Sequence, residues 1–217
     1  FSVPKVPYRE TIKKVAEGQG KYKKQTGGHG QYGDVWLRLE PASEYGFEWR
    51  ITGGVIPSKY QEAIEEGIKE AAKKGVLAGF PVMGFKAIVY NGSYHEVDSS
   101  DLAFQIAASL AFKKVMAEAH PVLLEPIYRL KVLVPQERVG DVLSDLQARR
   151  GRILGMEQEG ALSVVHAEVP LAEVLEYYKA LPGLTGGAGA YTLEFSHYAE
   201  VPPHLAQRIV QERAQEG

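Results

Sequence analysis

The sequence contains no cysteine among its 217 residues. A disulfide framework and a thiolate metal site are therefore excluded, and the absence of disulfides fits a protein of the cytoplasm. Long apolar runs are also missing, because no stretch is as long as the roughly 18 residues that a membrane-spanning helix needs. The first residues, Phe-Ser-Val-Pro-Lys-Val-Pro-Tyr, lack the basic and apolar segments of a signal peptide. We therefore expect no membrane partner.

A strong charge of either sign is absent as well. The formal net charge is -2, so the chain as a whole is not a polycation that would bind nucleic acid through its overall charge. Basic residues are nevertheless clustered in two places. The clusters are Lys13, Lys14, Lys21, Lys23 and Lys24, and then Arg149, Arg150 and Arg152. Such clusters can contact phosphate, although a solvated strand face is the simpler interpretation from sequence alone.

Motifs of catalysis are missing too. The sequence has no G-x-x-x-x-G-K-[ST] phosphate loop, no G-x-S-x-G nucleophile elbow and no histidine spacing typical of zinc. Residues 28–35 spell G-x-G-x-x-G-x-V, but a strand is expected to follow, whereas a dinucleotide site needs a helix there. A protein kinase is excluded because neither H-R-D nor D-F-G is present. We therefore assign no catalytic residue, no metal site and no cofactor to this chain.

Hydrophobic residues make up 45% of the chain, which is enough for the cores of two domains of roughly 100 residues each. Alternating and helical periodicities predict the elements, and proline and glycine mark the breaks. In the first half we expect strands over 8–17, 21–25, 35–39, 47–52 and 82–90, and helices over 57–75 and 98–119. After a break at 120–126 we expect strands over 127–134, 152–157, 161–169 and 190–197, and helices over 136–150, 171–180 and 204–214. The strand-helix-strand-strand-helix-strand order of this second half is that of ferredoxin-like folds.

Two loops are candidate recognition sites. The dipeptide 91–92, Asn-Gly, predicts a turn because both residues tolerate positive φ. Asp98 and Ser99 predict the N-cap of the next helix. His95 is then expected near a loop tip, where a histidine ring can stack on bases or hydrogen-bond to RNA. The glycine-rich segment 25–33 predicts a second tip, whose backbone N–H groups can approach phosphate closely.

The two tips together resemble translation elongation factor G. Six further segments match the family in order and at similar spacing. They are Gly53-Gly54-Val55-Ile56-Pro57, Gly79-Phe80-Pro81-Val82, Leu124-Glu125-Pro126-Ile127, Ala148-Arg149-Arg150-Gly151, Ile153-Leu154-Gly155-Met156 and Val169-Pro170-Leu171-Ala172-Glu173. The resemblance covers the whole chain and corresponds to the part of the factor that follows its GTPase, second and third domains.

The resemblance implies an α+β fold with two domains and a C-terminal helix. Residues 1–123 correspond to the fourth domain, a βαβ fold with a left-handed crossover that is related to a ribosomal-protein fold. Residues 124–200 correspond to the ferredoxin-like fifth domain, and residues 201–217 to the C-terminal helix. In the family, a GTPase domain with GTP and Mg²⁺ lies upstream, so we expect this fragment to be no enzyme by itself.

The resemblance also implies the partners. The fourth domain resembles a tRNA anticodon stem, and its tips enter the small-subunit decoding region during translocation of tRNA and mRNA. The fifth domain contacts the stalk base of the large subunit near the GTPase-activating rRNA. We therefore expect a cytoplasmic monomer that binds the ribosome and rRNA. The residues expected to bind RNA are Gly27, Gly28, His29, Gly30, Gln31, Ser93, Tyr94, His95, Arg149 and Arg150.

Departures from the family pattern predict a divergent paralogue. His29 stands where arginine is usual, Asp34 where histidine is common, and Asn91 where aspartate is. The loop 184–189 lacks the usual basic residues. Apart from the change at Asn91, these exchanges reduce the positive charge available for RNA. Ribosome recycling or rescue, a tetracycline-resistance-type ribosomal protection protein and a non-ribosomal scaffold remain alternatives, although the segment 94–98 favours the elongation-factor branch over the protection branch.

Overall fold

The computed structural model describes residues 5–25 and 28–216, which divide into two compact units. One unit contains Arg9–Leu123 together with residues 201–216, and we call it the four-stranded unit. The other contains residues 5–8 together with Leu124–Glu200, and we call it the ferredoxin-like unit. Each is described by itself below.

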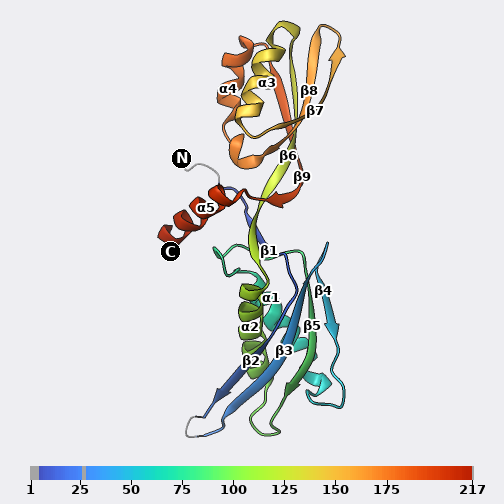
Figure 1. Cartoon of the computed structure of the whole chain (residues 1–217), viewed down its shortest axis with the longest axis vertical. Helices are drawn as coiled ribbons and strands as arrows, with labels where there is room; N and C mark the ends of the chain where they lie inside the picture. Colours follow the sequence, from blue (N-terminus) through green and yellow to red (C-terminus); the bar gives the residue numbers. More distant parts are fainter. Residues whose placement is uncertain (1–4, 26–27, 217) are drawn as a thin grey trace. The chain divides into compact units, whose positions relative to one another are not determined.

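The four-stranded unit has one mixed sheet covered by helices. Its elements are β1 (Arg9–Ile12), β2 (Ala16–Lys24), β3 (Gln31–Pro41), β4 (Gly46–Trp49), α1 (Gln61–Ala72), β5 (Phe85–Ser93), α2 (Asp101–Glu118) and α5 (Pro203–Glu216). The sheet order is β2-β3-β5-β4. β2, β3 and β5 pair antiparallel, whereas β4 runs parallel to β5 and is joined to it through α1. This is the expected βαβ arrangement, and α1 and α2 pack together on one face of the sheet (Figure 1).

Helix α2 approaches its neighbours so closely that only glycine fits opposite its backbone. A Cβ atom on Gly20 would lie 2.2 Å from the carbonyl oxygen of Ala107, and one on Gly33 would lie 2.6 Å from that of Ala103. On α1, a Cβ atom at Gly67 would lie 2.3 Å from another α2 carbonyl oxygen. Fully buried alanines complete this contact on the helix side. They are Ala103, Ala107, Ala108 and Ala111.

A buried carboxylate holds the loop that follows α1. Glu10 is fully buried and accepts hydrogen bonds from the backbone N–H groups of Leu77, Ala78 and Phe80 at 2.9, 3.0 and 2.9 Å. Arg213 of α5 donates to the Ala78 carbonyl oxygen at 3.1 Å, and its guanidinium lies 4.7 Å from the centre of the Phe80 ring. The C-terminal helix is therefore anchored to the loop that Glu10 holds.

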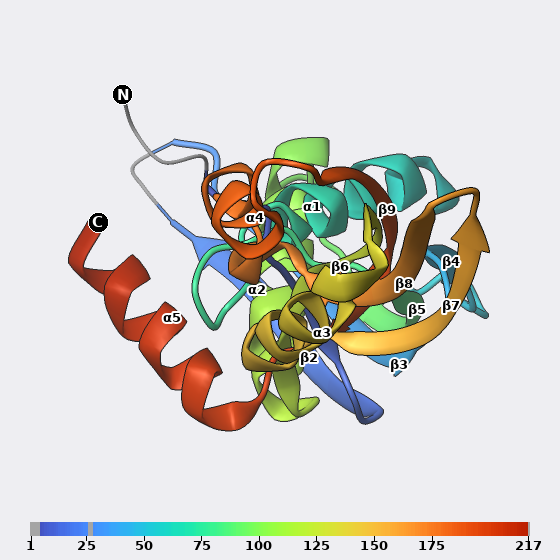
Figure 2. The same cartoon turned by 90° about the horizontal axis from the view of Figure 1, so that it is seen from above.

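The ferredoxin-like unit contains β6 (Pro121–Pro135, of which the unit takes the part from Leu124), α3 (Val139–Ala148), β7 (Arg152–Glu159), β8 (Leu162–Pro170), α4 (Tyr177–Thr185) and β9 (Ala190–Glu200). β8 pairs with β6 on one side and β7 on the other, and β9 pairs with β6, all antiparallel. Helices α3 and α4 lie side by side on one face of this sheet (Figures 1 and 2). The predicted ferredoxin-like order is thus confirmed.

Several predicted boundaries are wrong. The strand expected over 8–17 is broken, because the backbone N–H groups of Lys13 and Lys14 donate to the Ala119 carbonyl oxygen and separate β1 from β2. The break expected at 120–126 is instead strand, since β6 begins at Pro121, a position where a strand needs no N–H donor. The helices expected over 57–75, 136–150 and 171–180 each open with a short 3-10 turn. These turns are Ser58–Tyr60, Gln136–Arg138 and Leu171–Glu173.

The turn expected at Asn91-Gly92 is also wrong, because both residues lie inside β5. A Cβ atom on Gly92 would lie 2.2 Å from the carbonyl oxygen of Asp34, so this glycine permits a close strand approach. The chain turns at 96–98 instead. The helix N-cap is Ser100, whose hydroxyl accepts from the Ala103 N–H at 3.1 Å, and neither Asp98 nor Ser99 has this role.

Candidate nucleic-acid interface

The two loops singled out by the sequence lie side by side at one end of the four-stranded unit (Figure 1). The backbone N–H of Tyr32 donates to the Asp98 carbonyl oxygen at 3.0 Å. A Cβ atom on Gly30 would lie 3.0 Å from the Asp98 carboxylate. We call the described residues 28–31 and 93–98 the tip. Gly27, which was also expected to bind RNA, lies outside the described residues.

The centre of the tip is a pair of stacked rings. The Tyr32 and His95 ring centres are 3.9 Å apart and the ring planes differ by 4°. Tyr32 is only 6% exposed, whereas His95 is an exposed residue. The Lys21 ammonium lies 5.5 Å from the centre of the same tyrosine ring. The imidazole is therefore presented on a buried aromatic support, close to a positive charge.

A hydrogen-bonded chain of side chains lies beneath the stack. The Ser93 hydroxyl donates to one Asp34 carboxylate oxygen at 2.6 Å, and the Gln19 amide donates to the other at 2.6 Å. The Tyr32 hydroxyl and the Ser93 hydroxyl oxygen are also 2.6 Å apart. Because a serine hydroxyl has one hydrogen and Asp34 receives it, the tyrosine must be the donor. Ser93 is therefore engaged within the unit.

Ser99 closes the loop that carries His95. The backbone N–H of His95 donates to the Ser99 hydroxyl at 2.9 Å, and this hydroxyl donates to the Tyr32 carbonyl oxygen at 2.9 Å. The Ser99 N–H returns a bond to the His95 carbonyl oxygen at 3.0 Å. The serine that resembled a helix cap in the sequence therefore fastens the loop to β3.

The remaining tip residues differ in how far they face solvent. Gly28 and His29 are exposed, and a Cβ atom on Gly28 would have no atom within 4 Å. Tyr94 is 37% exposed. Gln31 is half-buried, and its amide oxygen is buried without a hydrogen-bond partner among the described residues. Gly33, the last glycine of the G-x-G-x-x-G pattern, packs against α2 and does not belong to the tip.

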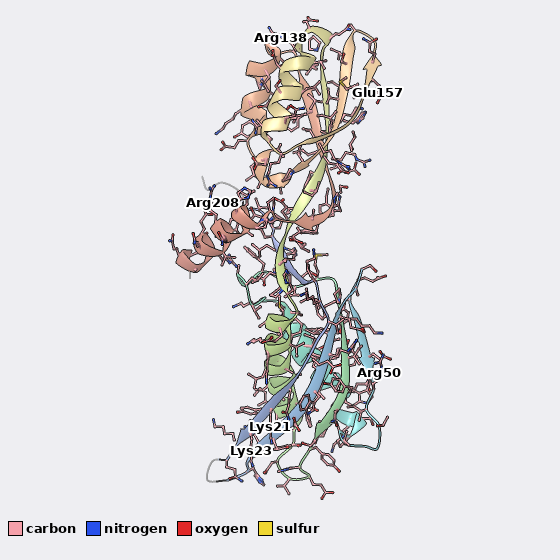
Figure 3. All side chains as sticks on the ribbon, in the orientation of Figure 1. Lys21, Lys23, Arg50, Arg138, Glu157 and Arg208 are labelled. Atoms are coloured by element: carbon pink, nitrogen blue, oxygen red, sulfur yellow. The ribbon has the colours of Figure 1, made fainter. Side chains whose placement is uncertain are left out.

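Exposed lysines follow β2 toward the tip. Lys21, Lys23 and Lys24 are all exposed, and none of them forms an ion pair within the described ranges. Figure 3 shows Lys21 and Lys23 near the end of β2 at which the two loops lie. The tip itself carries the acidic residues Glu96 and Asp98, so the positive charge lies on one side of it. This arrangement can attract a phosphate backbone to the β2 side.

Arg149 and Arg150 are directed into their own unit. Arg150 makes two 2.9 Å bonds to Glu125, which is 3% exposed, and one 3.2 Å bond to Glu173. Hydrogen bonding to Glu125 raises the pKa of Arg150. Arg149 donates to Asp145 at 2.8 Å and to the Glu173 carbonyl oxygen at 2.6 Å. Since both guanidinium groups already form hydrogen bonds within their own unit, we do not include them in the interface proposed below.

Sequence reasoning missed a cation beside the loop 184–189. A Cβ atom on Gly186 would lie 3.4 Å from an Arg138 guanidinium nitrogen. The only ion pair of Arg138 within the described residues is a long one to Asp141, at 3.9 Å. Arg138 lies just before α3 and Gly186 just after α4, so only the packing of these helices brings the two together. No local pattern could have indicated this neighbour.

Two findings concern other kinds of site. Among residues 5–25 and 28–216, no group of three or more His, Cys, Asp or Glu side chains could hold a metal ion. Within the same ranges, every helix is too short or too polar to span a bilayer.

Comparison with known proteins assigns both halves of the chain. The family described as elongation factor G, domain IV, matches residues 4–120, and the one described as elongation factor G C-terminus matches residues 122–209. The chain is 52% identical to elongation factor G of Aquifex pyrophilus, over 97% of this chain and 30% of that protein. It is also 52% identical to an elongation factor G-like protein of Thermotoga maritima, over 98% of this chain and 32% of the relative.

A third relative, elongation factor G of Thermotoga maritima, is again 52% identical, over 95% of this chain and 31% of that protein. The identity is thus the same for a protein named elongation factor G and for one named elongation factor G-like in the same organism. The chain spans about a third of the length of these curated relatives. With both of its halves matched in order, the chain belongs to the elongation factor G family, of which it comprises domain IV and the C-terminal part.

Proposed function

We propose that this chain is the ribosome- and rRNA-binding part of a translational GTPase of the elongation factor G type. Its tip enters the small-subunit decoding region during translocation of tRNA and mRNA. The nucleotide chemistry, with GTP and Mg²⁺, belongs to a GTPase domain upstream of these residues, and the protein acts as a monomer in the cytoplasm. The observation that carries the proposal is the exposed His95 ring, stacked on Tyr32 at the end of the four-stranded unit.

The chemistry of the tip suits RNA. An imidazole can hydrogen-bond to a 2′-hydroxyl or stack on an unpaired base, and the exposed Tyr94 ring adds a second stacking surface. The open backbone at Gly28 can approach a sugar-phosphate chain closely. Lys23 and Lys24 supply charge for phosphate, which makes binding depend on salt. Each of these groups is exposed at one end of a single unit.

The loop 184–189 is the proposed contact of the ferredoxin-like unit with large-subunit rRNA at the stalk base. Gly186 and Gly187 have positive φ values of 65° and 83°, and a Cβ atom on Gly187 would meet nothing within 4 Å. The N–H groups of Gly186 and Gly187 both donate to the Pro182 carbonyl oxygen, so the loop offers a phosphate the Arg138 guanidinium beside these glycines rather than their amides. With a single cation, this contact is weaker than one made by a loop that has basic residues of its own.

We also propose that this chain comes from a divergent paralogue of elongation factor G. This proposal rests on His29, on Asp34 and on the loop 184–189, all of which reduce the charge available for RNA relative to the family pattern. A paralogue that serves ribosome recycling or rescue would use the same architecture. Kinetic assays of the full-length protein in translocation and in ribosome splitting separate these roles.

Sedimentation with ribosomes tests the proposed function. We expect the chain to pellet with ribosomes in low salt and to be released in high salt, with protection of decoding-region nucleotides in an rRNA footprint. Replacing Lys23 and Lys24 with glutamine is expected to lower the slope of log affinity against log salt by about 0.7 for each phosphate that is no longer neutralised. The matched control replaces Lys69 and Lys73, which pair with Glu65 and Glu70, and so removes the same charge away from the tip.

Two results would contradict the proposal. Absence of co-sedimentation at every salt concentration would favour the non-ribosomal scaffold. Equal loss of binding in the two lysine pairs would mean that overall charge, and not the β2 side of the tip, drives the association.

A further inference from the structure

We propose that Tyr32 is the positioning residue of the tip, and that Asp34, acting through Ser93, holds it in the orientation that presents His95. The proposal rests on the proposed function, because it concerns how the RNA-facing loop is prepared for its partner.

Tyr32 contacts the second loop in four different ways. Its ring stacks on His95 with centres 3.9 Å apart, and its hydroxyl lies 2.6 Å from that of Ser93. Its backbone N–H donates to Asp98 at 3.0 Å, and its carbonyl oxygen accepts from Ser99 at 2.9 Å. A single residue of β3 therefore fixes the start, the middle and the end of the loop 93–99.

Asp34 determines the direction of the hydrogen bonds. It is 6% exposed, and its two carboxylate oxygens accept one hydrogen bond each, from Ser93 and from Gln19. In the strand register Asp34 lies opposite Ser93, and being two residues from Tyr32 it lies on the same face of β3. A carboxylate only accepts, so it obliges Ser93 to donate and Tyr32 to donate in turn. The aspartate that departs from the family pattern thus orders this chain of bonds.

The consequence for binding is preorganisation. An unsupported histidine at a loop tip would lose rotamer freedom when it engages RNA, and that loss would weaken binding. With the ring already held flat on Tyr32, most of this loss occurs on folding. Freeing the ring is therefore expected to weaken ribosome binding about fivefold.

The ring stack can be followed directly by nuclear magnetic resonance of the 217-residue chain. The ring current of Tyr32 shifts the imidazole protons of His95 upfield in the wild-type chain. Tyr32→Leu is expected to abolish this shift. Tyr32→Phe keeps the ring but loses the hydrogen bond to Ser93, so it is expected to reduce the shift. Asp34→Asn, which takes away one acceptor, is expected to reduce it. Tyr90→Leu is the control, because Tyr90 pairs with Trp36 and does not contact His95.

A double-mutant cycle on ribosome affinity separates positioning from general stability. Tyr32→Leu is expected to weaken binding about fivefold when His95 is present and to have no further effect in a His95→Ala background, because Tyr32 acts through the imidazole. Tyr32→Phe, which keeps the ring but loses the hydrogen bond to Ser93, is expected to have an intermediate affinity, as is Asp34→Asn.

Three results would overturn the inference. An unchanged His95 resonance in Tyr32→Leu would mean that the tyrosine does not hold the ring. An equal loss of affinity with and without His95 would mean that Tyr32 only stabilises the fold. Full affinity in Tyr32→Leu would mean that positioning is irrelevant to binding. If the wild-type chain fails to bind ribosomes, the proposed function fails, and the resonance experiment then decides the positioning claim alone.

Discussion

Replacing Arg150 with alanine is expected to destabilise the ferredoxin-like unit by about 3 kcal/mol while leaving the four-stranded unit unchanged. Arg150 places two 2.9 Å hydrogen bonds on Glu125, a carboxylate that is 3% exposed. Its removal would leave this carboxylate buried without its cation. Such losses cost about 3–5 kcal/mol for fully buried pairs. We take the lower end because the Arg150 side chain is itself 30% exposed.

The backbone at this position gives a second, independent expectation. Arg150 has a φ of 57°, in the left-handed region that disfavours residues with a Cβ atom. Alanine keeps that cost, whereas glycine removes about 1 kcal/mol of it. Arg150→Gly should therefore destabilise the unit by about 1 kcal/mol less than Arg150→Ala. Glu125→Gln is a matched change that keeps the shape of the carboxylate and removes its charge.

The two tryptophans make the measurement specific. Trp36 and Trp49 both belong to the four-stranded unit, so fluorescence follows that unit alone, whereas far-ultraviolet circular dichroism follows both. In urea, the circular dichroism transition of Arg150→Ala should move about 2 M lower, for a slope near 1.5 kcal/mol per M. The fluorescence transition should not move. If both transitions stay in place while ribosome affinity falls, Arg150 faces RNA as the sequence pattern indicated, and our structural reasoning is refuted.

Three further predictions follow from side chains described above. The Tyr177 hydroxyl is buried without a hydrogen-bond partner among the described residues, so Tyr177→Phe should stabilise the ferredoxin-like unit by about 1 kcal/mol in urea unfolding. Burial raises the pKa of Tyr177 from 10.0 to about 12. Between these pH values the unfolded chain has lost the proton and the folded chain has kept it, so the stability of the wild-type chain falls as the pH rises. The stability advantage of Tyr177→Phe should therefore grow over this pH range, and a constant advantage would contradict the argument. His95→Ala should cost at most about 1 kcal/mol from the lost stack while slowing the ribosomal step of the full-length protein, and a large drop in melting temperature would show a core role instead. Ala188→Arg should tighten ribosome binding at low salt and steepen the log–log salt dependence by about 0.7–0.9, and Arg138→Ala should flatten it, whereas unchanged slopes in both would mean that the loop 184–189 touches nothing.

The order of elements was predictable because it depends on local periodicity. The ferredoxin-like half followed from alternation and helical spacing, and its order is confirmed. The errors arose where a neighbour far along the chain overrides a local preference. Gly92 resembles a turn residue, but Asp34 on the adjacent strand comes so close that only glycine fits. Pro121 resembles a break, yet it is the first residue of β6.

The tip was predictable in part. The sequence indicated His95 and the exposed glycine at position 28, because polar and glycine residues between regular elements are a local signal. Nothing local indicates that Tyr32 supports His95, since the two residues are far apart along the chain and meet only through the fold. The same reason explains Arg150, whose partner Glu125 lies on another element. A cluster of arginines in a sequence does not reveal which carboxylates the fold will place against it.

The contact between α2 and the sheet has a mechanical consequence. At Gly20 and Gly33 the helix and the strands meet backbone to backbone, with no layer of flexible side chains between them that could yield under load. A force applied at the loops would therefore be transmitted along the strands with little deformation of the unit. A methyl group added at either glycine would push the helix away from the strands and make the unit less stiff. At the exposed Gly28 of the tip, by contrast, an added Cβ atom would meet nothing within 4 Å, so a side chain there could change the chemistry of the tip without disturbing the contact between helix and strands.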